Sequence, residues 1–215
     1  MLFGRPMTSR SKTLAAFGAL ALIALGGVAA FYSVQGQAGN SGSCSAAAAT
    51  AEKLRPLARG ELAAVEVAKA SQPLPNLAFN GPDGQPTTLS AFKGRTVLVN
   101  LWATWCLPCL HEMPSLDALQ GKLGGQDFAV VAVNIDTRNL EKPKTWLAER
   151  KIDQLRYYAD PEAKVFQDLR SAKKIEGMPV SFLVDPSGCE LAMLQGPADW
   201  ASQDALSFIR TALGR

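Results

Sequence analysis

The chain has 215 residues, of which 47% are hydrophobic and 19% charged, an ordinary balance for a protein with a buried core. Its formal net charge is +3. Arg5, Arg10 and Lys12 precede the first apolar run; without them, 19 of the 22 basic residues remain, against 19 acidic ones. A phosphate-binding surface needs a cationic excess, so the composition argues against nucleic acid as a partner.

The first clear pattern is an almost wholly apolar run over residues 14–34. No charged residue lies between Lys12 and Glu52, and the basic residues stand only on the N-terminal side of the run. A helix of this length rises about 30 Å, the thickness of a bilayer core. By the positive-inside rule we expect residues 1–13 in the cytoplasm, a single-pass transmembrane anchor over 14–34 in the cytoplasmic (inner) membrane, and the rest in the periplasm.

Two other interpretations of this N-terminal segment, a cleaved signal peptide and a lipoprotein anchor, also place the rest of the chain in the periplasm. Residues 36–38 (Gly-Gln-Ala) resemble a signal-peptidase site, but cleaved signal peptides have shorter apolar cores of roughly 7–15 residues. A lipoprotein anchored at Cys44 is less favoured, because Ser41-Gly42-Ser43 lacks the leucine of a lipobox. We therefore favour a retained anchor.

The next two segments connect this anchor to a folded domain. Residues 35–43 are rich in Gly, Ser, Gln and Asn, which is typical of a flexible linker. Residues 44–70 are rich in Ala, Glu, Lys and Leu, with leucines at helical spacing, and predict an N-terminal extension of one or two helices broken near Pro56 and Gly60.

Residues 71–215 predict one domain in which strands and helices alternate. Such alternation, followed by two adjacent strands, favours a layered α/β fold with a mixed central sheet flanked by helices. We expect strands at 77–79, 87–89, 96–101, 128–135, 156–159, 180–184 and 191–195. We expect helices at 107–122, 143–150, 161–169 and 199–213, the last capped by Asp199.

The strongest chemical signal is a pair of cysteines, Cys106 and Cys109, between a predicted buried strand and the start of a predicted helix. Unpaired N–H groups and the helix dipole stabilise a thiolate there, which lowers the pKa of Cys106. The spacing lets Cys109, on the more inward side of the helix, form a disulfide with Cys106. We expect Cys106 to attack a partner's disulfide and Cys109 to resolve the mixed disulfide.

Half of a zinc site is the usual alternative for two cysteines at this spacing. The chain has one histidine, His111, and its other cysteines, Cys44 and Cys189, do not form a second such pair. We therefore predict no metal and no cofactor, and a redox-active disulfide at Cys106 and Cys109.

Around this motif, residues 71–213 resemble the thioredoxin superfamily. Residues 100–109 are similar to its strand-to-helix signature, Pro114 to a proline in its active-site helix, and Pro179 to a cis-proline that faces the cysteine pair. Only X-Pro bonds reach the cis form at modest cost. The resemblance implies a thioredoxin-like fold, a catalytic role for Pro179 and partner contacts at Trp105, Leu107, Pro108 and Met178.

The chain departs from thioredoxin at two positions. It has Asn100 where thioredoxin has a buried aspartate and Ala132 where thioredoxin has a lysine, so the usual proton-relay pair is absent. Glu112 matches an acidic residue of the periplasmic reductases. It lies one helical turn after Cys109 and could exchange a proton with that thiol; a solvated surface carboxylate is the alternative.

A closer resemblance is to the TlpA-like proteins, membrane-anchored periplasmic thiol:disulfide reductases of alpha-proteobacteria. It rests on four stretches, 98–106, 134–138, 164–169 and 184–190, on the predicted anchor and on Cys44 and Cys189. It implies a structural disulfide between Cys44 and Cys189; two free buried thiols are the alternative. It also implies a disulfide-reducing enzyme, with electrons from a membrane thiol carrier.

In that family the partners are a Sco-type copper chaperone and the oxidase subunit that receives copper, whose cysteines must be reduced before they bind the metal. The resemblance therefore implies a role in assembling the copper centre of cytochrome c oxidase. Reduction of apocytochrome c before haem attachment is the nearest alternative. A copper-binding chaperone is less favoured because the distal histidine is absent, and a peroxidase because Ala103 replaces the expected Thr or Ser.

Overall fold

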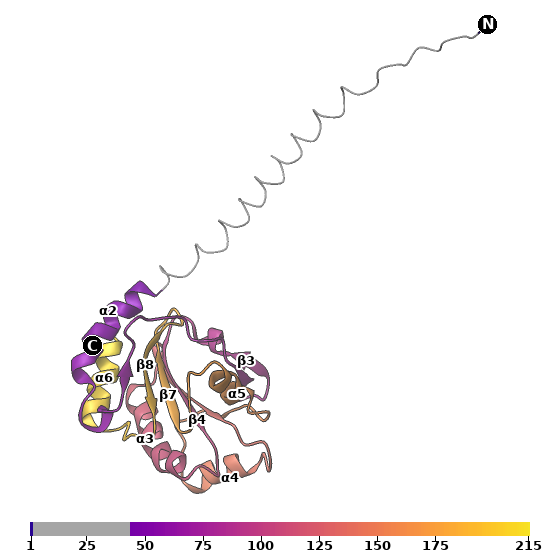
Figure 1. Ribbon diagram of the computed structural model, residues 1–215. Coiled ribbons are helices and arrows are strands. Elements are labelled where there is room, and N and C mark those ends of the chain that lie inside the picture. The colour runs from indigo at the N-terminus through magenta and orange to yellow at the C-terminus, as the bar shows by residue number, and fades with distance from the viewer. Residues whose placement is uncertain (2–43) are drawn as a thin grey trace. The chain divides into compact units, whose positions relative to one another are not determined.

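The computed structural model describes Met1 and residues 44–215. The chain divides into two units, Met1–Gly42 and Ser43–Arg215, and the second is the folded part shown in Figure 1. Within the described residues, no helix has the length and apolar character that a membrane crossing requires. The predicted anchor at 14–34 and linker at 35–43 lie outside those residues.

An eight-stranded mixed sheet forms the centre of the folded unit, which confirms the predicted α/β class. Its strand order is β1-β8-β7-β4-β5-β6-β2-β3; β4–β5 and β5–β6 are parallel pairs, and the other neighbours are antiparallel. The strands are β1 (Glu66–Val67), β2 (Ala78–Asn80), β3 (Pro86–Thr88), β4 (Thr96–Trp102), β5 (Phe128–Asn134), β6 (Tyr158–Ala159), β7 (Val180–Val184) and β8 (Glu190–Gln195).

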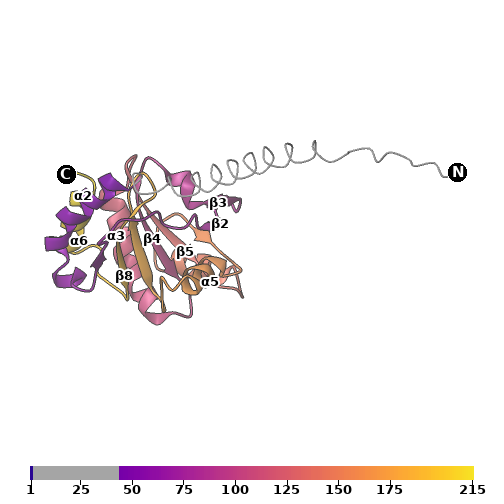
Figure 2. The same ribbon diagram turned by 45° about the horizontal axis from the view of Figure 1, so that its top comes forward.

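Helices cover both faces of the sheet, and the two faces have separate cores. Alternate side chains of β4 point to opposite faces, so Leu98 packs in the core with α2, α3 and α6, and Val99 in the core with α5. Figures 1 and 2 show α2 beside α6 and α5 across the sheet. The helices are α2 (Ser45–Leu54), α3 (Leu107–Leu123), α4 (Lys142–Glu149), α5 (Lys164–Ser171) and α6 (Gln203–Ala212), with short 3-10 helices η1 (Arg55–Leu57), η2 (Gly60–Leu62) and η3 (Leu89–Phe92).

The N-terminal extension is only partly helical. After α2 the chain forms η1 and η2, and Glu66–Val67 then adds β1 to the edge of the sheet beside β8. The prediction of helix through this stretch was wrong at β1. The leucine spacing reflects burial of Leu54 and Leu62 against the sheet and α6, which short helical turns achieve as well as a continuous helix.

Two helix starts differ from the prediction because other residues cap them. Helix α6 begins at Gln203, since the Ser202 hydroxyl, not Asp199, accepts from a backbone N–H of its first turn. Helix α5 begins at Lys164, not at Pro161. There Asp160 accepts from the Val165 N–H at 2.6 Å, and Ala163 takes a left-handed conformation with φ of 51°.

Candidate redox-active site

The cysteine pair lies where β4 leads into α3. Cys106 is the N-cap of α3, with extended backbone angles, and its sulfur accepts from the Cys109 N–H at 3.3 Å. Cys106 and Cys109 form a disulfide, with their Cα atoms 5.3 Å apart. Cys109 is completely buried and Cys106 nearly so. The first turn of α3 therefore directs the Cys109 N–H at the Cys106 sulfur, and a thiolate is stabilised at such a helix N-terminus.

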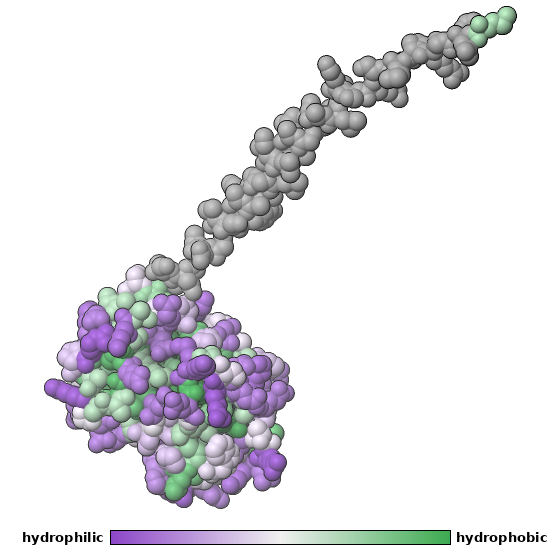
Figure 3. Space-filling view, in the orientation of Figure 1, coloured by the Kyte–Doolittle hydropathy of each residue, from purple (hydrophilic) through white to green (hydrophobic). Residues whose placement is uncertain are grey.

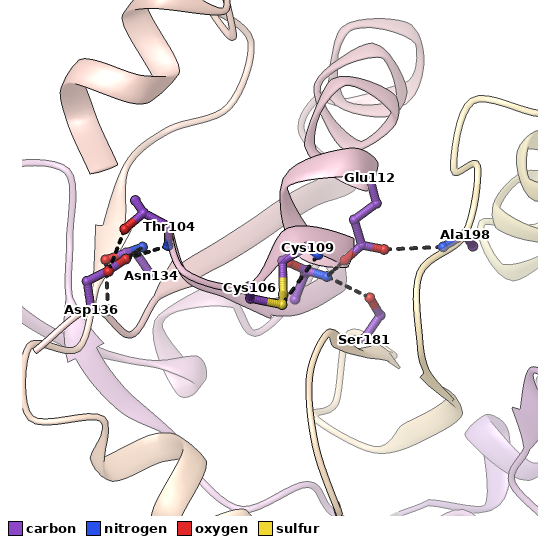
Figure 4. Close-up of a disulfide and its surroundings, with 9 residues drawn as sticks. Thr104, Cys106, Cys109, Glu112, Asn134, Asp136, Ser181 and Ala198 are labelled. Atoms are coloured by element: carbon purple, nitrogen blue, oxygen red, sulfur yellow. Dashed lines mark hydrogen bonds between the residues drawn. A yellow bond between two sulfur atoms is a disulfide. The ribbon is translucent and has the colours of Figure 1, made fainter. Parts of the chain in front are cut away.

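Glu112 is buried in the interior beside this disulfide, so the alternative of a solvated carboxylate was wrong. One carboxylate oxygen accepts from the Asn100 amide at 2.7 Å; the other accepts from the Ala198 N–H and the Trp200 indole N–H, each at 3.3 Å. In the view of Figure 4, the carboxylate lies between the disulfide and Ala198. Burial raises the pKa of Glu112 from its ordinary 4.5 to about 7, although these three donors oppose the rise.

Asn100 connects this carboxylate to the sheet. It stands on β4 between Ala132 of β5 and Ser181 of β7 in the strand register, and its amide also donates to the Ser181 hydroxyl at 3.0 Å. A buried polar chain thus runs from Ser181 through Asn100 to Glu112. Neither Ser181 nor Trp200 could be identified from the sequence, because a single serine or tryptophan far along the chain matches no spacing pattern.

Pro179 directly precedes β7. The Met178–Pro179 peptide bond is cis, the form that the resemblance implied. Pro179 is followed by Val180, which pairs with Leu101 of β4. The cis proline is thus held next to the strand that leads to Cys106.

A second buried cluster, which no sequence motif indicates, fixes the turn before Cys106. Asp136 accepts from the Thr104 N–H at 2.8 Å, from the Thr104 hydroxyl at 2.7 Å and from the Asn134 amide at 2.7 Å. Figure 4 shows these three side chains together before the cysteine turn. Thr104 follows β4 and Asp136 follows β5. Because these two strands are parallel, their C-terminal ends lie at one edge of the sheet, and this is the one sequence-level clue that could have predicted the contact.

The two outlying cysteines also meet. Cys44, directly before α2, forms a disulfide with Cys189, directly before β8, across 145 residues of sequence. Both are buried, and this is the pairing that the resemblance implied. The bond joins the start of the N-terminal extension to the sheet, away from the Cys106–Cys109 pair.

The four side chains expected to contact partners differ in exposure. Trp105 and Leu107 are 65% and 63% exposed, a high value for such large apolar side chains. Pro108 is exposed, whereas Met178 is half-buried. Figure 3 shows a face of the folded unit on which hydrophobic and hydrophilic residues are mixed. The apolar side chains on both sides of Cys106 are therefore open to a second protein.

The amino-acid sequence matches a known protein family. The family model described as Redoxin matches residues 69–207. The chain belongs to the Redoxin family. It is 32% identical over 123 residues to the thioredoxin-like protein YneN of Bacillus subtilis, covering 54% of this chain and 66% of YneN. It is 30% identical over 114 residues to the thiol-disulfide oxidoreductase ResA of Geobacillus kaustophilus, covering 53% of this chain and 62% of ResA.

Solved structures agree with this membership. A Chlorobium tepidum protein assigned as the thiol:disulfide interchange protein DsbE superposes with a TM-score of 0.58 at 30% identity, covering 67% of this chain and 97% of that one. StoA of Bacillus subtilis, at 18% identity and a TM-score of 0.51, shares the fold. The chain spans less than two thirds of the length of the curated relatives YneN and ResA. It is a thioredoxin-like member of the Redoxin family, and ResA among its relatives is named a thiol-disulfide oxidoreductase.

Proposed function

We propose that this Redoxin-family protein is a membrane-anchored, TlpA-like reductase that reduces cysteine pairs in partner proteins on the periplasmic side of the cytoplasmic membrane. The observation that carries the proposal is the Cys106–Cys109 disulfide at the N-terminus of α3, with the buried carboxylate of Glu112 one turn away. The names of the relatives support disulfide exchange as the chemistry.

The reaction begins with the reduced protein. The Cys106 thiolate attacks one sulfur of a partner's disulfide, a mixed disulfide forms, and the partner's other sulfur leaves as a thiolate that takes up a proton. Cys109 gives its proton to Glu112 and attacks the Cys106 sulfur. The mixed disulfide breaks, the partner leaves with two thiols, and the Cys106–Cys109 disulfide forms. A dithiol protein of the membrane then reduces that disulfide.

Glu112 suits the second step because of its environment. A general acid–base group works best with a pKa near the working pH, and burial brings the pKa of Glu112 to about 7. Residues 109 and 112 are neighbours on one helix face. The carboxylate can therefore take the Cys109 proton when the disulfide forms and return it when the disulfide is reduced.

Export of the domain is supported by the Cys44–Cys189 disulfide, because structural disulfides persist in oxidising compartments. In such a compartment a reductant is needed wherever thiols must bind copper or haem. We propose that the partners are a Sco-type copper chaperone and the copper-binding subunit of cytochrome c oxidase. Apocytochrome c is the alternative partner with the same chemistry.

The test is to trap the mixed disulfide. In the anchored protein, Cys109→Ser lets Cys106 attack but removes the thiol that resolves the bond. Covalent partners are then isolated from the periplasm under non-reducing conditions. The matched control is Cys106→Ser, which lacks the attacking sulfur and keeps Cys109.

Each result decides one part of the proposal. Captured copper-site assembly proteins support the role in oxidase assembly, whereas captured apocytochrome c moves the function to cytochrome c maturation. An identical set of proteins with Cys109→Ser and Cys106→Ser would falsify the exchange mechanism.

A further inference from the structure

A groove lies beside the cysteine turn, and in Figure 4 its lining residues Thr104 and Asp136 lie on the opposite side of the disulfide from Glu112. It has a volume of about 320 Å³, and Trp105, Asp136, Arg138, Asn139 and Lys142 are among the residues that line it. In the register of the parallel strands, Trp102 at the end of β4 pairs with Asn134 at the end of β5. The loop after β5 therefore stands next to the turn that carries Trp105 and Cys106.

Two cations in this groove have no carboxylate partner. Arg138 and Lys142 are both exposed, and among residues 44–215 neither belongs to an ion pair. Asp136 lines the same groove, but its carboxylate is buried and already accepts three hydrogen bonds. The neighbouring Glu141 is paired with Lys144 at 3.2 Å. The groove therefore presents positive charge to the solvent.

The loop also holds these cations in a defined arrangement. Asn139 adopts a left-handed conformation with φ of 51°, which asparagine tolerates better than most residues. The Lys142 N–H donates to the Asn139 carbonyl at 2.8 Å, and α4 begins at Lys142. Arg138 and Lys142 thus stand on either side of a closed turn, with the indole of Trp105 lining the same groove.

We propose that Trp105, Arg138 and Lys142 form a docking surface for a partner segment in which acidic residues flank the target cysteine. The inference rests on the proposed function, since Cys106 must react with that cysteine. Complementary charge speeds encounter and selects partners more than it strengthens the final complex. An extended segment whose cysteine meets Cys106 can lay its neighbouring carboxylates over Arg138 and Lys142.

The experiment compares two disulfide-bonded peptides that differ only in the residues beside the cysteines, glutamate in one and lysine in the other. The reduced full-length protein reacts with each in a single turnover, and the second-order rate constant is measured from the change in tryptophan fluorescence. The variant is Arg138→Glu with Lys142→Glu. The matched control is Lys53→Glu with Lys93→Glu, two exposed lysines outside the groove that give the same change in net charge.

We expect the unaltered protein to prefer the acidic peptide, and the groove variant to react with it about tenfold more slowly and to gain on the basic peptide. The control variant should keep the original preference, and all three proteins should reduce hydroxyethyl disulfide, which is small and neutral, at the same rate. Equal rates of the groove variant and the unaltered protein with both peptides would overturn the docking surface. An equal loss in the control variant would also overturn it, because net charge would then explain the effect. Failure of the unaltered protein to reduce hydroxyethyl disulfide would instead reject the proposed function.

Discussion

The side-chain amide of Asn100 donates a 2.7 Å hydrogen bond to the Glu112 carboxylate and so ties β4 to α3 beside the redox disulfide. An amide stabilises a carboxylate by its dipole alone, whereas a lysine would add a full positive charge. Burial therefore outweighs the three donors, and the pKa of Glu112 stays at about 7. Thioredoxin has a buried aspartate at the position of Asn100. An aspartate there would repel the Glu112 carboxylate, and with Asn100 in its place Glu112 is the single acid of this pair.

The first prediction concerns stability against pH in the Glu112→Gln variant. The folded-state pKa of about 7 lies above the ordinary 4.5, so the folded protein holds this proton more tightly than the unfolded chain. The stability contributed by protonated Glu112 is complete below the pKa of the unfolded state and is lost as the pH rises through the pKa of the folded state. We expect the free energy of unfolding, relative to Glu112→Gln, to fall by about 3 kcal/mol between about pH 4 and pH 8.

Denaturant unfolding of the oxidised proteins across this range measures the effect. The matched control is Glu149→Gln, an exposed glutamate at the end of α4, which should leave the pH dependence unchanged. A stability difference between Glu112→Gln and the unaltered protein that stays constant from acid to neutral pH would contradict the raised pKa.

The second prediction is that Asn100→Ala raises the pKa of Glu112 further. The amide hydrogen bond favours the charged form, and a hydrogen bond to a charged group is worth roughly 1.5–3 kcal/mol, so its loss should raise the pKa by about one unit or more. Carbon NMR of the Glu112 carboxyl group gives the titration directly. Trp200→Phe removes a longer bond of 3.3 Å and should produce a smaller rise. An unchanged or lower pKa in Asn100→Ala would show that Asn100 does not stabilise the carboxylate.

The third prediction concerns the Cys44–Cys189 disulfide. It closes a loop with a sequence separation of 145, for which the chain-entropy model gives a stabilisation of about 4–5 kcal/mol at most. We expect the Cys44→Ser, Cys189→Ser double variant to lose stability of that order in urea unfolding while it still exchanges disulfides. The matched control, Cys106→Ser with Cys109→Ser, opens a loop with a separation of only three and should lose much less. Equal losses in the two double variants would refute this account.

Local patterns predicted most of the fold and the cysteine chemistry. The apolar runs at 96–101 and 128–135 correspond to β4 and β5 within one residue, because a strand buried on both faces reads as a continuous apolar stretch. Cys106 and Cys109 were identified because three residues of spacing at a helix start have a direct chemical meaning.

Features that depend on contacts between distant segments were not predicted. Glu66–Val67 becomes a strand only because the edge of β8 is free to pair with it. Trp200 reaches Glu112 from 88 residues away, and no sequence spacing records that approach. Helix starts were hard to predict for the same reason. Several residues, here Asp160, Asp199 and Ser202, have side chains that can cap a helix, and only the local backbone decides which of them accepts the N–H groups.

The last prediction concerns Asp136, which holds the turn before Cys106. Asp136→Ala leaves the Thr104 N–H, the Thr104 hydroxyl and the Asn134 amide without their acceptor in a buried site, and a hydrogen bond to a charged group contributes roughly 1.5–3 kcal/mol. We expect a loss of about 3 kcal/mol in denaturant unfolding and a slower attack of Cys106 on hydroxyethyl disulfide, because Thr104 is then no longer fixed. Thr104→Val removes only the hydroxyl bond and keeps the backbone bond, so it should lose less stability and keep most of the rate. If Asp136→Ala lost stability without any change in rate, the cluster would support the fold alone, and the position of Cys106 would depend on α3 instead.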